Sequence, residues 1–259
     1  METIDLLGSS SIPWTILGRG SNTLAPTCGW HGAVVLLKGD LAGFSFNGSL
    51  LKAGGGAYLP AMAGVACSLG LSGLTFAVGI PGTAGGAVFM NAGAYGSSIA
   101  DLVQETRVLH PGGSIEYFTG RECDFGYRSS RFQKENSIII DIKLKLSAEI
   151  ESAADLRIKA REILRLRREK FPLRAPNAGS VFRRPDSGPP PGKLIEDSGL
   201  KGYSIGGAMV SHTHANFILN TGNATSTEVL KLIGHVTEKV LKDSGIMLKT
   251  EITILGDRI

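Results

Sequence analysis

The chain has 259 residues, of which 42% are hydrophobic and 19% charged, and its formal net charge is +4. This length is enough for one large domain or two modest ones. Glycine contributes 35 residues, but there are only 11 prolines and no Gly-X-Y period, which excludes a collagen-like chain. We find no apolar run of the roughly 18 residues that span a bilayer, and no secretion signal at the N-terminus. These features predict a cytoplasmic protein with no membrane partner.

Cysteine and histidine usage gives no sign of a disulfide framework or a metal site. The three cysteines are widely spaced and form no C-x-x-C. His212 and His214 form an H-x-H without a third ligand at metal-binding spacing, so we predict no metal. Seven of the 27 basic residues crowd into 157–170, and the overall basicity therefore does not indicate a nucleic-acid partner.

The first half of the chain alternates strand-like runs with glycine-rich loops. A helix is predicted over 58–69, because Pro60 lies in its first turn, apolar residues recur at helical spacing and Gly70 follows. A glycine-dense run covers 79–96. The predicted strands of this half are 14–18, 33–37, 105–109 and 137–146, the last with an apolar residue at every second position.

The second half has a different composition. A helix is predicted over 153–170 and ends before Pro172, where a proline-rich stretch indicates a domain boundary or a long ordered loop. Thr225 begins a T-x-x-E capping box with Glu228, which predicts a helix ending at Gly245. The predicted strands are 208–210, 216–219 and an alternating terminal strand over 248–254.

Two glycine-rich segments are candidates for binding a ligand through the backbone. The sequence LGRGSN, residues 17–22, follows a predicted strand and lacks the third glycine and the helix of a Rossmann fingerprint. It fits either a plain turn or a loop whose amides wrap a phosphate. The run GIPGTAGGAVFMNAGAYG, residues 79–96, fits either a tightly packed crossover or a backbone that a flat ligand approaches closely. Together the two segments favour a bound dinucleotide without identifying one.

Six ordered segments resemble one enzyme family. They are LGRGSN, GIPGTAGGAVFMNAGAYG, DFGYRSSRF (124–132), NAGSVFRRP (177–185), GKLIEDSGLKG (192–202) and HANFILN (214–220). Their order is similar to that in UDP-N-acetylenolpyruvoylglucosamine reductases, the flavoenzymes that make UDP-N-acetylmuramate for peptidoglycan. The resemblance implies an α+β fold: a PCMH-type FAD-binding domain over 1–150, a connecting helix over 151–172, and a smaller α+β substrate-binding domain over 173–259.

The resemblance also implies the ligands. It implies FAD as cofactor, NADPH as co-substrate and a UDP-sugar as substrate, and we expect a monomer. The family's flavin-binding positions correspond to residues of the two glycine-rich loops. These are Gly18, Arg19, Gly20, Ser21, Asn22, Gly79, Ile80, Pro81, Gly82, Thr83, Gly85, Gly86, Ala87, Asn91, Ala92, Gly93 and Ala94.

Three catalytic residues follow from the resemblance. In the implied reaction NADPH reduces FAD, and hydride then reaches C3 of the enolpyruvyl group, leaving an enolate at C2. Arg128 would stabilise this enolate, Ser180 would donate the proton to C2, and Glu251 would act with Arg128. Without the resemblance, the same residues read as a surface arginine, a loop serine and a strand carboxylate paired with Lys249.

Further expectations concern the substrate and the start of the chain. The resemblance places Tyr127, Lys193 and Asn216 near the nucleotide sugar, with Lys193 on the diphosphate and Asn216 on the uracil or ribose. The strand–helix unit that usually precedes the first loop of the family is missing here. We therefore expect weaker FAD binding or an unpaired sheet edge. An inactive UDP-sugar-binding relative is the alternative, although a pure binder has no reason to keep Arg128, Ser180 and Glu251.

Overall fold

The computed structural model describes residues 2–135, 137–148 and 151–255, and the chain divides into two compact units. The first unit comprises Met1–Arg19 and Gly32–Leu166, and the second comprises Gly20–His31 and Arg167–Ile259. Residues 20–31 thus group with the C-terminal part of the chain, whereas the domain order expected from the sequence runs through them without a break. The expected boundary at residue 150 lies outside the described residues. None of the described helices is long and apolar enough to cross a membrane.

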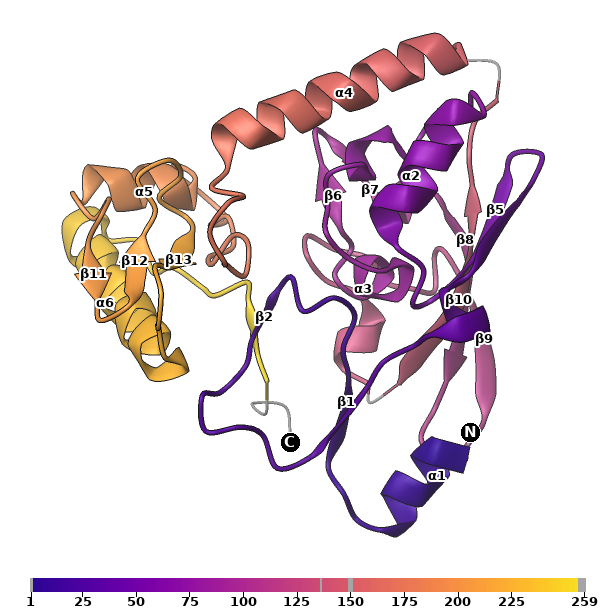
Figure 1. Cartoon of the computed structure of the whole chain (residues 1–259), viewed down its shortest axis with the longest axis horizontal. Helices are drawn as coiled ribbons and strands as arrows, with labels where there is room; N and C mark the ends of the chain where they lie inside the picture. The colour runs from indigo at the N-terminus through magenta and orange to yellow at the C-terminus, as the bar shows by residue number, and fades with distance from the viewer. Residues whose placement is uncertain (1, 136, 149–150, 256–259) are drawn as a thin grey trace. The chain divides into compact units, whose positions relative to one another are not determined.

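A five-stranded antiparallel sheet forms the centre of the first unit, in the order β4-β5-β10-β8-β9 (Figure 1). The predicted strands at 105–109 and 137–146 are confirmed as β8 and β10. Ile138, Ile139 and Ile140 of β10 are buried in succession, and burial alternates only from Ile140 to Leu144. A bulge interrupts the register with β8 between Ile139 and Asp141. The strands are β4 (Phe44–Asn47), β5 (Leu50–Gly54), β8 (Val103–Leu109), β9 (Ile115–Thr119) and β10 (Ile138–Lys145).

The hairpin of β4 and β5 was not predicted, although the sequence carries a signal for it. Asn47 pairs with Leu50, and Gly48 in the turn between them has a φ of 57°. Gly48 and Ser49 are thus the two loop residues, and glycine at the first of them is a hairpin signal because that position needs positive φ. The rings of Phe44 and Phe46 pack edge to face on this hairpin.

The remaining elements of the first unit are short. The predicted strands at 14–18 and 33–37 are confirmed as the parallel pair β1 (Trp14–Ile16) and β3 (Ala33–Val35). The predicted helix at 58–69 is confirmed as α2 (Leu59–Ser68), and its buried face joins the main core. The others are α1 (Glu2–Ser9), η1 (Gly39–Ala42), η2 (Thr75–Ala77), α3 (Ala84–Phe89), β6 (Gly93–Ala94), β7 (Ser97–Ser98), η3 (Ile99–Asp101) and η4 (Arg131–Gln133).

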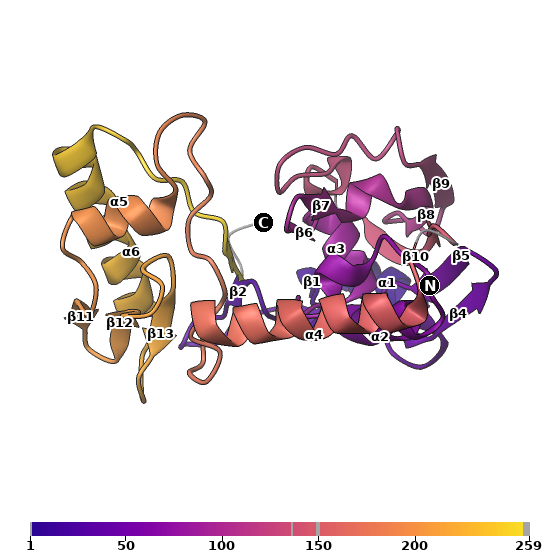
Figure 2. The same cartoon turned by 90° about the horizontal axis from the view of Figure 1, so that it is seen from above.

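The second unit packs two helices and a small antiparallel sheet around its own core (Figure 2). The sheet order is β11 (Ser204–Ile205), β12 (Ala208–Val210) and β13 (Ile218–Asn220), with α5 (Pro191–Asp197) and α6 (Ser226–Ser244) beside it. The predicted capping box is confirmed, since Thr225 Oγ1 accepts from Glu228 N and Glu228 Oε2 accepts from Thr225 N. Gly245 ends α6 with a φ of 72°. The predicted helix at 153–170 is confirmed as α4 (Ala153–Lys170), which belongs to the first unit as far as Leu166.

The predicted terminal strand over 248–254 is wrong in its extent. Only β14 (Thr253–Ile254) is a regular strand, and it pairs in parallel with β2 (Thr23–Leu24). The residues before it pair instead with 181–183, through a single bridge between Phe182 and Thr250. Because the segment changes partner along its length, one continuous strand does not form.

Candidate active site

The two glycine-rich loops contact each other within the first unit. A Cβ built on Gly18 would lie 2.8 Å from Thr83 Oγ1, so a side chain there would displace the hydroxyl that accepts from the Gly86 amide. Tyr58 and Thr83 form an isolated antiparallel bridge, and the Leu59 amide donates to the Gly82 carbonyl at 3.1 Å. The guanidinium of Arg19 lies 4.8 Å from the centroid of the Tyr58 ring. Gly18, the Arg19 guanidinium and the exposed ring of Tyr58 thus lie beside the start of the second loop.

The run 79–96 is a tightly packed crossover in one part and an open backbone in another. Around Gly85 it is a packed crossover: the Gly85 amide donates to the Gly55 carbonyl at 2.8 Å, and a Cβ at Gly85 would lie 3.0 Å from the same oxygen. Gly82 is different, because no atom of the described residues lies within 4 Å of a Cβ built there. Within the described part of the chain, the amides of Gly82 and Thr83 donate no hydrogen bond to another backbone or side chain.

This donor set fits the diphosphate of a dinucleotide such as FAD. Unbonded backbone amides and a guanidinium are the groups that hold phosphate oxygens, and an open glycine lets a ligand approach the backbone. Within the run, Pro81 and Gly86 are exposed, whereas Ala84, Gly85 and Ala87 are buried and serve the core. The expected cofactor contacts of Gly85 and Ala87 stay predictions.

Arg128 is bound to the second half of the same run. Its Nη2 donates to the Gly93 carbonyl at 3.0 Å and its Nη1 to the Asn91 carbonyl at 3.5 Å. The Asn91 side chain in turn donates to the Gly126 carbonyl at 2.8 Å. Tyr127 is exposed, with its ring 5.3 Å from the Arg128 guanidinium carbon. The structure thus places the predicted catalytic arginine directly on a predicted cofactor-binding loop.

In the second unit, the chain segments of Ser180 and Glu251 are neighbours. The Asn177 side chain accepts from the Gly179 amide at 2.9 Å, and Ser180 follows this turn in a half-buried position. The Glu251 amide donates to the carbonyl of Val181 at 2.7 Å. Asn22, the last residue of the first glycine-rich segment, donates from its side chain to the Glu251 carbonyl at 3.2 Å. That segment is divided, since Gly18 and Arg19 belong to the first unit and residues 20–22 to the second.

Asn216 is buried and holds the Ser180 segment in place. Its Nδ2 donates to the Phe182 carbonyl at 2.9 Å, and its Oδ1 accepts from the Phe182 amide at 3.0 Å. The Asn216 carbonyl also accepts from the Val181 amide at 2.9 Å. Both ends of the side-chain amide are thus engaged by the protein, and its expected contact with uracil or ribose stays a prediction.

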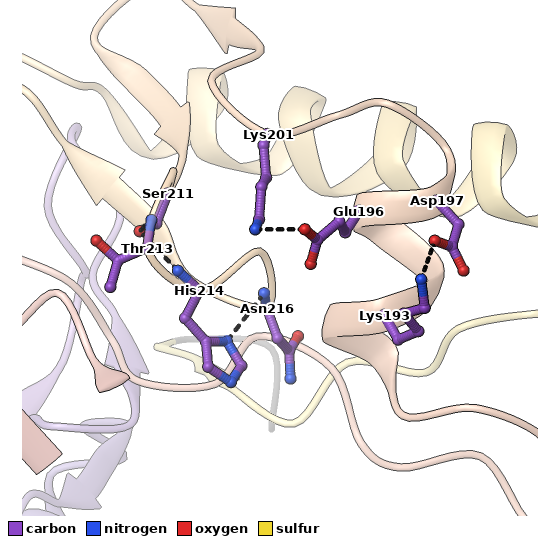
Figure 3. Close-up of polar contacts among 8 residues, drawn as sticks. All are labelled: Lys193, Glu196, Asp197, Lys201, Ser211, Thr213, His214 and Asn216. Atoms are coloured by element: carbon purple, nitrogen blue, oxygen red, sulfur yellow. Dashed lines mark hydrogen bonds and ion pairs between the residues drawn. The ribbon is translucent and has the colours of Figure 1, made fainter. Parts of the chain in front are cut away.

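The predicted diphosphate ligand Lys193 lies in a polar cluster near His214 (Figure 3). Lys193 forms an exposed ion pair with Asp197, and Lys201 pairs with Glu196 at 2.7 Å. The hydrogen bond to Asp197 raises the pKa of the Lys193 ammonium. The Lys193 ammonium is therefore charged at neutral pH.

His214 is held as a neutral ring. Its Nδ1 accepts from the Asn216 amide at 3.3 Å, and its ring packs against those of Phe171 and Phe217. Burial lowers the pKa of His214, and the nearby ammonium of Lys170 lowers it further. Among the described residues, no group of three or more His, Cys, Asp and Glu side chains is placed to hold a metal ion.

Sequence analysis missed two residues of the first unit, Tyr58 and Gln133. Tyr58 meets Arg19 only because it pairs with Thr83. Gln133 donates to the carbonyls of Phe89 and Arg128 at 2.9 and 3.0 Å. No local sequence pattern predicts these contacts. Arg19 and Tyr58 are distant along the chain, and Gln133 bonds to backbone carbonyls, which every residue has.

Comparison with known proteins first gives the class of each part. Residues 1–119 match the model of an FAD binding domain, and residues 171–255 match that of the UDP-N-acetylenolpyruvoylglucosamine reductase C-terminal domain. The chain therefore consists of an FAD-binding domain followed by a reductase C-terminal domain, which confirms the expected α+β fold class.

Relatives over almost the whole chain then give the family. The UDP-N-acetylenolpyruvoylglucosamine reductase of Heliobacterium modesticaldum is 43% identical over 95% of this chain and 78% of its own length. That of Caldanaerobacter subterraneus is 44% identical over 100% of this chain and 84% of its own. The crystal structure of the Thermus caldophilus reductase, 32% identical, matches with a TM-score of 0.83 over 96% of this chain and 88% of that one. The chain belongs to the UDP-N-acetylenolpyruvoylglucosamine reductase family.

Proposed function

We propose that this chain reduces UDP-N-acetyl-enolpyruvoylglucosamine to UDP-N-acetylmuramate, with FAD as cofactor and NADPH as reductant, in the synthesis of peptidoglycan precursors. The observation that carries the proposal is the bond from Arg128 Nη2 to the Gly93 carbonyl, 3.0 Å long. It fixes a guanidinium on the loop whose open part, at Gly82, fits the diphosphate of FAD. The family to which the chain belongs supports the same reaction.

In this reaction FAD, when bound, carries a hydride from NADPH to the enolpyruvyl double bond. The amides of Gly82 and Thr83 and the guanidinium of Arg19 hold its diphosphate, with Arg19 oriented by the Tyr58 ring. Arg128 stabilises the negative charge that develops on C2 and its carboxylate. A guanidinium suits this task because it is planar, always charged and here already bonded to the loop.

Ser180 and Glu251 complete the chemistry on the substrate. Addition of hydride at C3 leaves a carbanion equivalent at C2, which takes one proton to give the saturated lactyl ether. The hydroxyl of Ser180 donates that proton, and Glu251 acts together with Arg128. The turn at Gly179, which has a φ of 80°, and the bonds from Asn216 to Phe182 set the position of the Ser180 backbone on both sides.

Lys193 and Tyr127 are the proposed substrate-binding residues outside the reacting centre. Lys193 and Asp197 form an exposed pair, which contributes little stability and exchanges readily for a diphosphate. Tyr127 presents an exposed ring beside Arg128. We further propose that the chain acts as a monomer in the cytoplasm, where its two nucleotide substrates are available.

The test is incubation of the purified chain with FAD, NADPH and the enolpyruvyl nucleotide. We expect NADPH consumption, followed at its near-ultraviolet absorbance, and a product heavier than the substrate by two hydrogen atoms in mass spectrometry. Binding of the UDP-sugar without NADPH consumption or a reduced product would instead support the inactive UDP-sugar-binding relative. Size-exclusion chromatography with light scattering tests the monomer.

A further inference from the structure

Arg128 occupies a backbone conformation that residues with a Cβ rarely adopt. It has a φ of 52° in the tight turn from Gly126 to Ser129, whose amides and carbonyls bond to each other at 3.1 and 3.3 Å. Positive φ is usual for glycine or asparagine in such turns. A non-glycine residue persists there only where its surroundings hold it. The contacts of the Arg128 backbone therefore decide whether this conformation is kept.

Gln133 makes these contacts. Its Nε2 donates to the Arg128 carbonyl at 3.0 Å and to the Phe89 carbonyl at 2.9 Å, which uses both N–H groups of the side-chain amide. The same nitrogen lies 3.5 Å from Met90 Sδ. Phe89 is the last residue of α3, the helix that begins directly after Thr83. One side-chain amide thus ties the peptide of Arg128 to the end of the helix in the glycine-rich run.

The two ends of Arg128 are held by different groups. Gln133 holds its carbonyl, while Gly93 accepts from its guanidinium at 3.0 Å. Asn91 holds the other side of the turn through the Gly126 carbonyl. The chain segment just before Gln133 is itself held in place. Phe132 is completely buried, and Ser130 Oγ also donates to the Phe89 carbonyl, at 2.8 Å. Loss of the Gln133 donors would remove these hydrogen bonds to the Arg128 and Phe89 carbonyls and leave those between Gly126 and Ser129 in place.

We propose that Gln133 is a positioning residue for the reduction of the enolpyruvyl group, and that it acts through Arg128. This inference rests on the proposed function, because it requires Arg128 to stabilise the developing charge. Gln133 bonds to protein carbonyls and acts on the substrate only by fixing the arginine. Its loss therefore lowers kcat for the enolpyruvyl substrate and leaves its KM and the reduction of flavin by NADPH nearly unchanged.

The first test compares the two half-reactions in Gln133→Glu, which keeps the shape but places a carboxylate oxygen against two carbonyls. Stopped-flow spectroscopy of the FAD-loaded enzyme should show reduction by NADPH within about two-fold of wild type. Reoxidation by the enolpyruvyl nucleotide should slow by about ten-fold, since small misplacements of a catalytic group cost one to two orders of magnitude. Gln133→Met, which removes the donors without adding charge, should show the same defect. The control is Gln104→Glu, the same change at an exposed position on β8, with both rates unchanged.

A double-mutant cycle then separates positioning from general damage. If Arg128→Met alone slows reoxidation by about 100-fold, the double variant Arg128→Met/Gln133→Glu should be slowed by the same factor and not by about 1000-fold. Multiplied effects, or equal slowing of both half-reactions in Gln133→Glu and Gln133→Met, would overturn the role of Gln133 while the proposed function stands. A wild-type enzyme whose reduced flavin is not reoxidised by the enolpyruvyl nucleotide would overturn the proposed function, and the positioning role with it.

Discussion

The glycine-rich run of the first unit and the Ser180 segment of the second hold their predicted catalytic residues in different ways. In the first, backbone carbonyls hold a side chain: Gly93 and Asn91 accept from Arg128. In the second, a side chain holds the backbone: Asn216 brackets the peptide groups of Phe182. The difference teaches where substitutions act. Changes of glycine, or of the Gln133 amide, alter the first region, whereas changes of the Asn216 amide alter the second.

The largest effect is expected at Gly55, which lies outside the run but packs on it, since its carbonyl accepts from the Gly85 amide. A Cβ on Gly55 would overlap the carbonyl oxygen of Ile139 in the central strand, so the backbone itself would have to move. Gly55→Ala should therefore destabilise the protein by more than about 3 kcal/mol, at the upper end of overpacking effects. Urea unfolding measures this loss. The control is Gly64→Ala, at an exposed helical position with open space for the methyl group, and equal stability of the two variants would refute the packing.

A catalytic effect is expected next, from the second region. Ser180→Ala should leave reduction of the flavin by NADPH fast but slow its reoxidation by the enolpyruvyl nucleotide by about 100-fold, the scale of lost acid catalysis. Single-turnover absorbance separates the two rates. Ser187→Ala, at an exposed position of the same long loop, provides the matched control. If Ser180→Ala and Ser187→Ala behave alike, Ser180 is not the proton donor.

A smaller effect is expected where the first region is open. Gly82→Ala adds a methyl group that meets none of the described residues, so the melting temperature should change little. The same methyl group lies where the diphosphate would approach the backbone, and FAD affinity of the apoprotein should fall by about ten-fold. Titration calorimetry with FAD provides the measurement. Unchanged affinity would remove Gly82 from the cofactor site.

The smallest expected effect is the dependence of stability on pH that comes from His214 in the second unit. The pKa of His214 is lowered from its ordinary value of 6.5, mainly by burial. Below pH 6.5 the unfolded chain therefore binds more protons than the folded one, and stability falls as the pH drops from 6.5 through the folded pKa. Urea unfolding at several pH values from 8 down to about 5 should show this loss. His214→Phe should reduce it, whereas His212→Phe, at an exposed position, should not; equal slopes in both variants would contradict the assignment.

The sequence carried enough information for the elements with strong local signals. The capping box at Thr225 and the alternation in β10 predicted their elements correctly, because each signal lies within the element that it forms. The Gly48-Ser49 loop carries an equally local signal, but the hairpin it forms was not predicted. The terminal strand was predicted too long, since its extent depends on two partner segments far away in the chain. The attachment of Arg128 to Gly93 was not predictable from spacing, because it depends on how two loops fold together.

The most direct test of the account is a visible absorption spectrum of the purified chain with FAD, taken anaerobically with NADPH and then with UDP-N-acetyl-enolpyruvoylglucosamine. The account predicts a bound flavin that NADPH bleaches and the enolpyruvyl nucleotide restores. In Arg128→Met, bleaching should persist and recovery should slow by about 100-fold. A colourless protein, or a flavin bleached by NADPH that the enolpyruvyl nucleotide does not restore in the wild-type chain, would contradict the account.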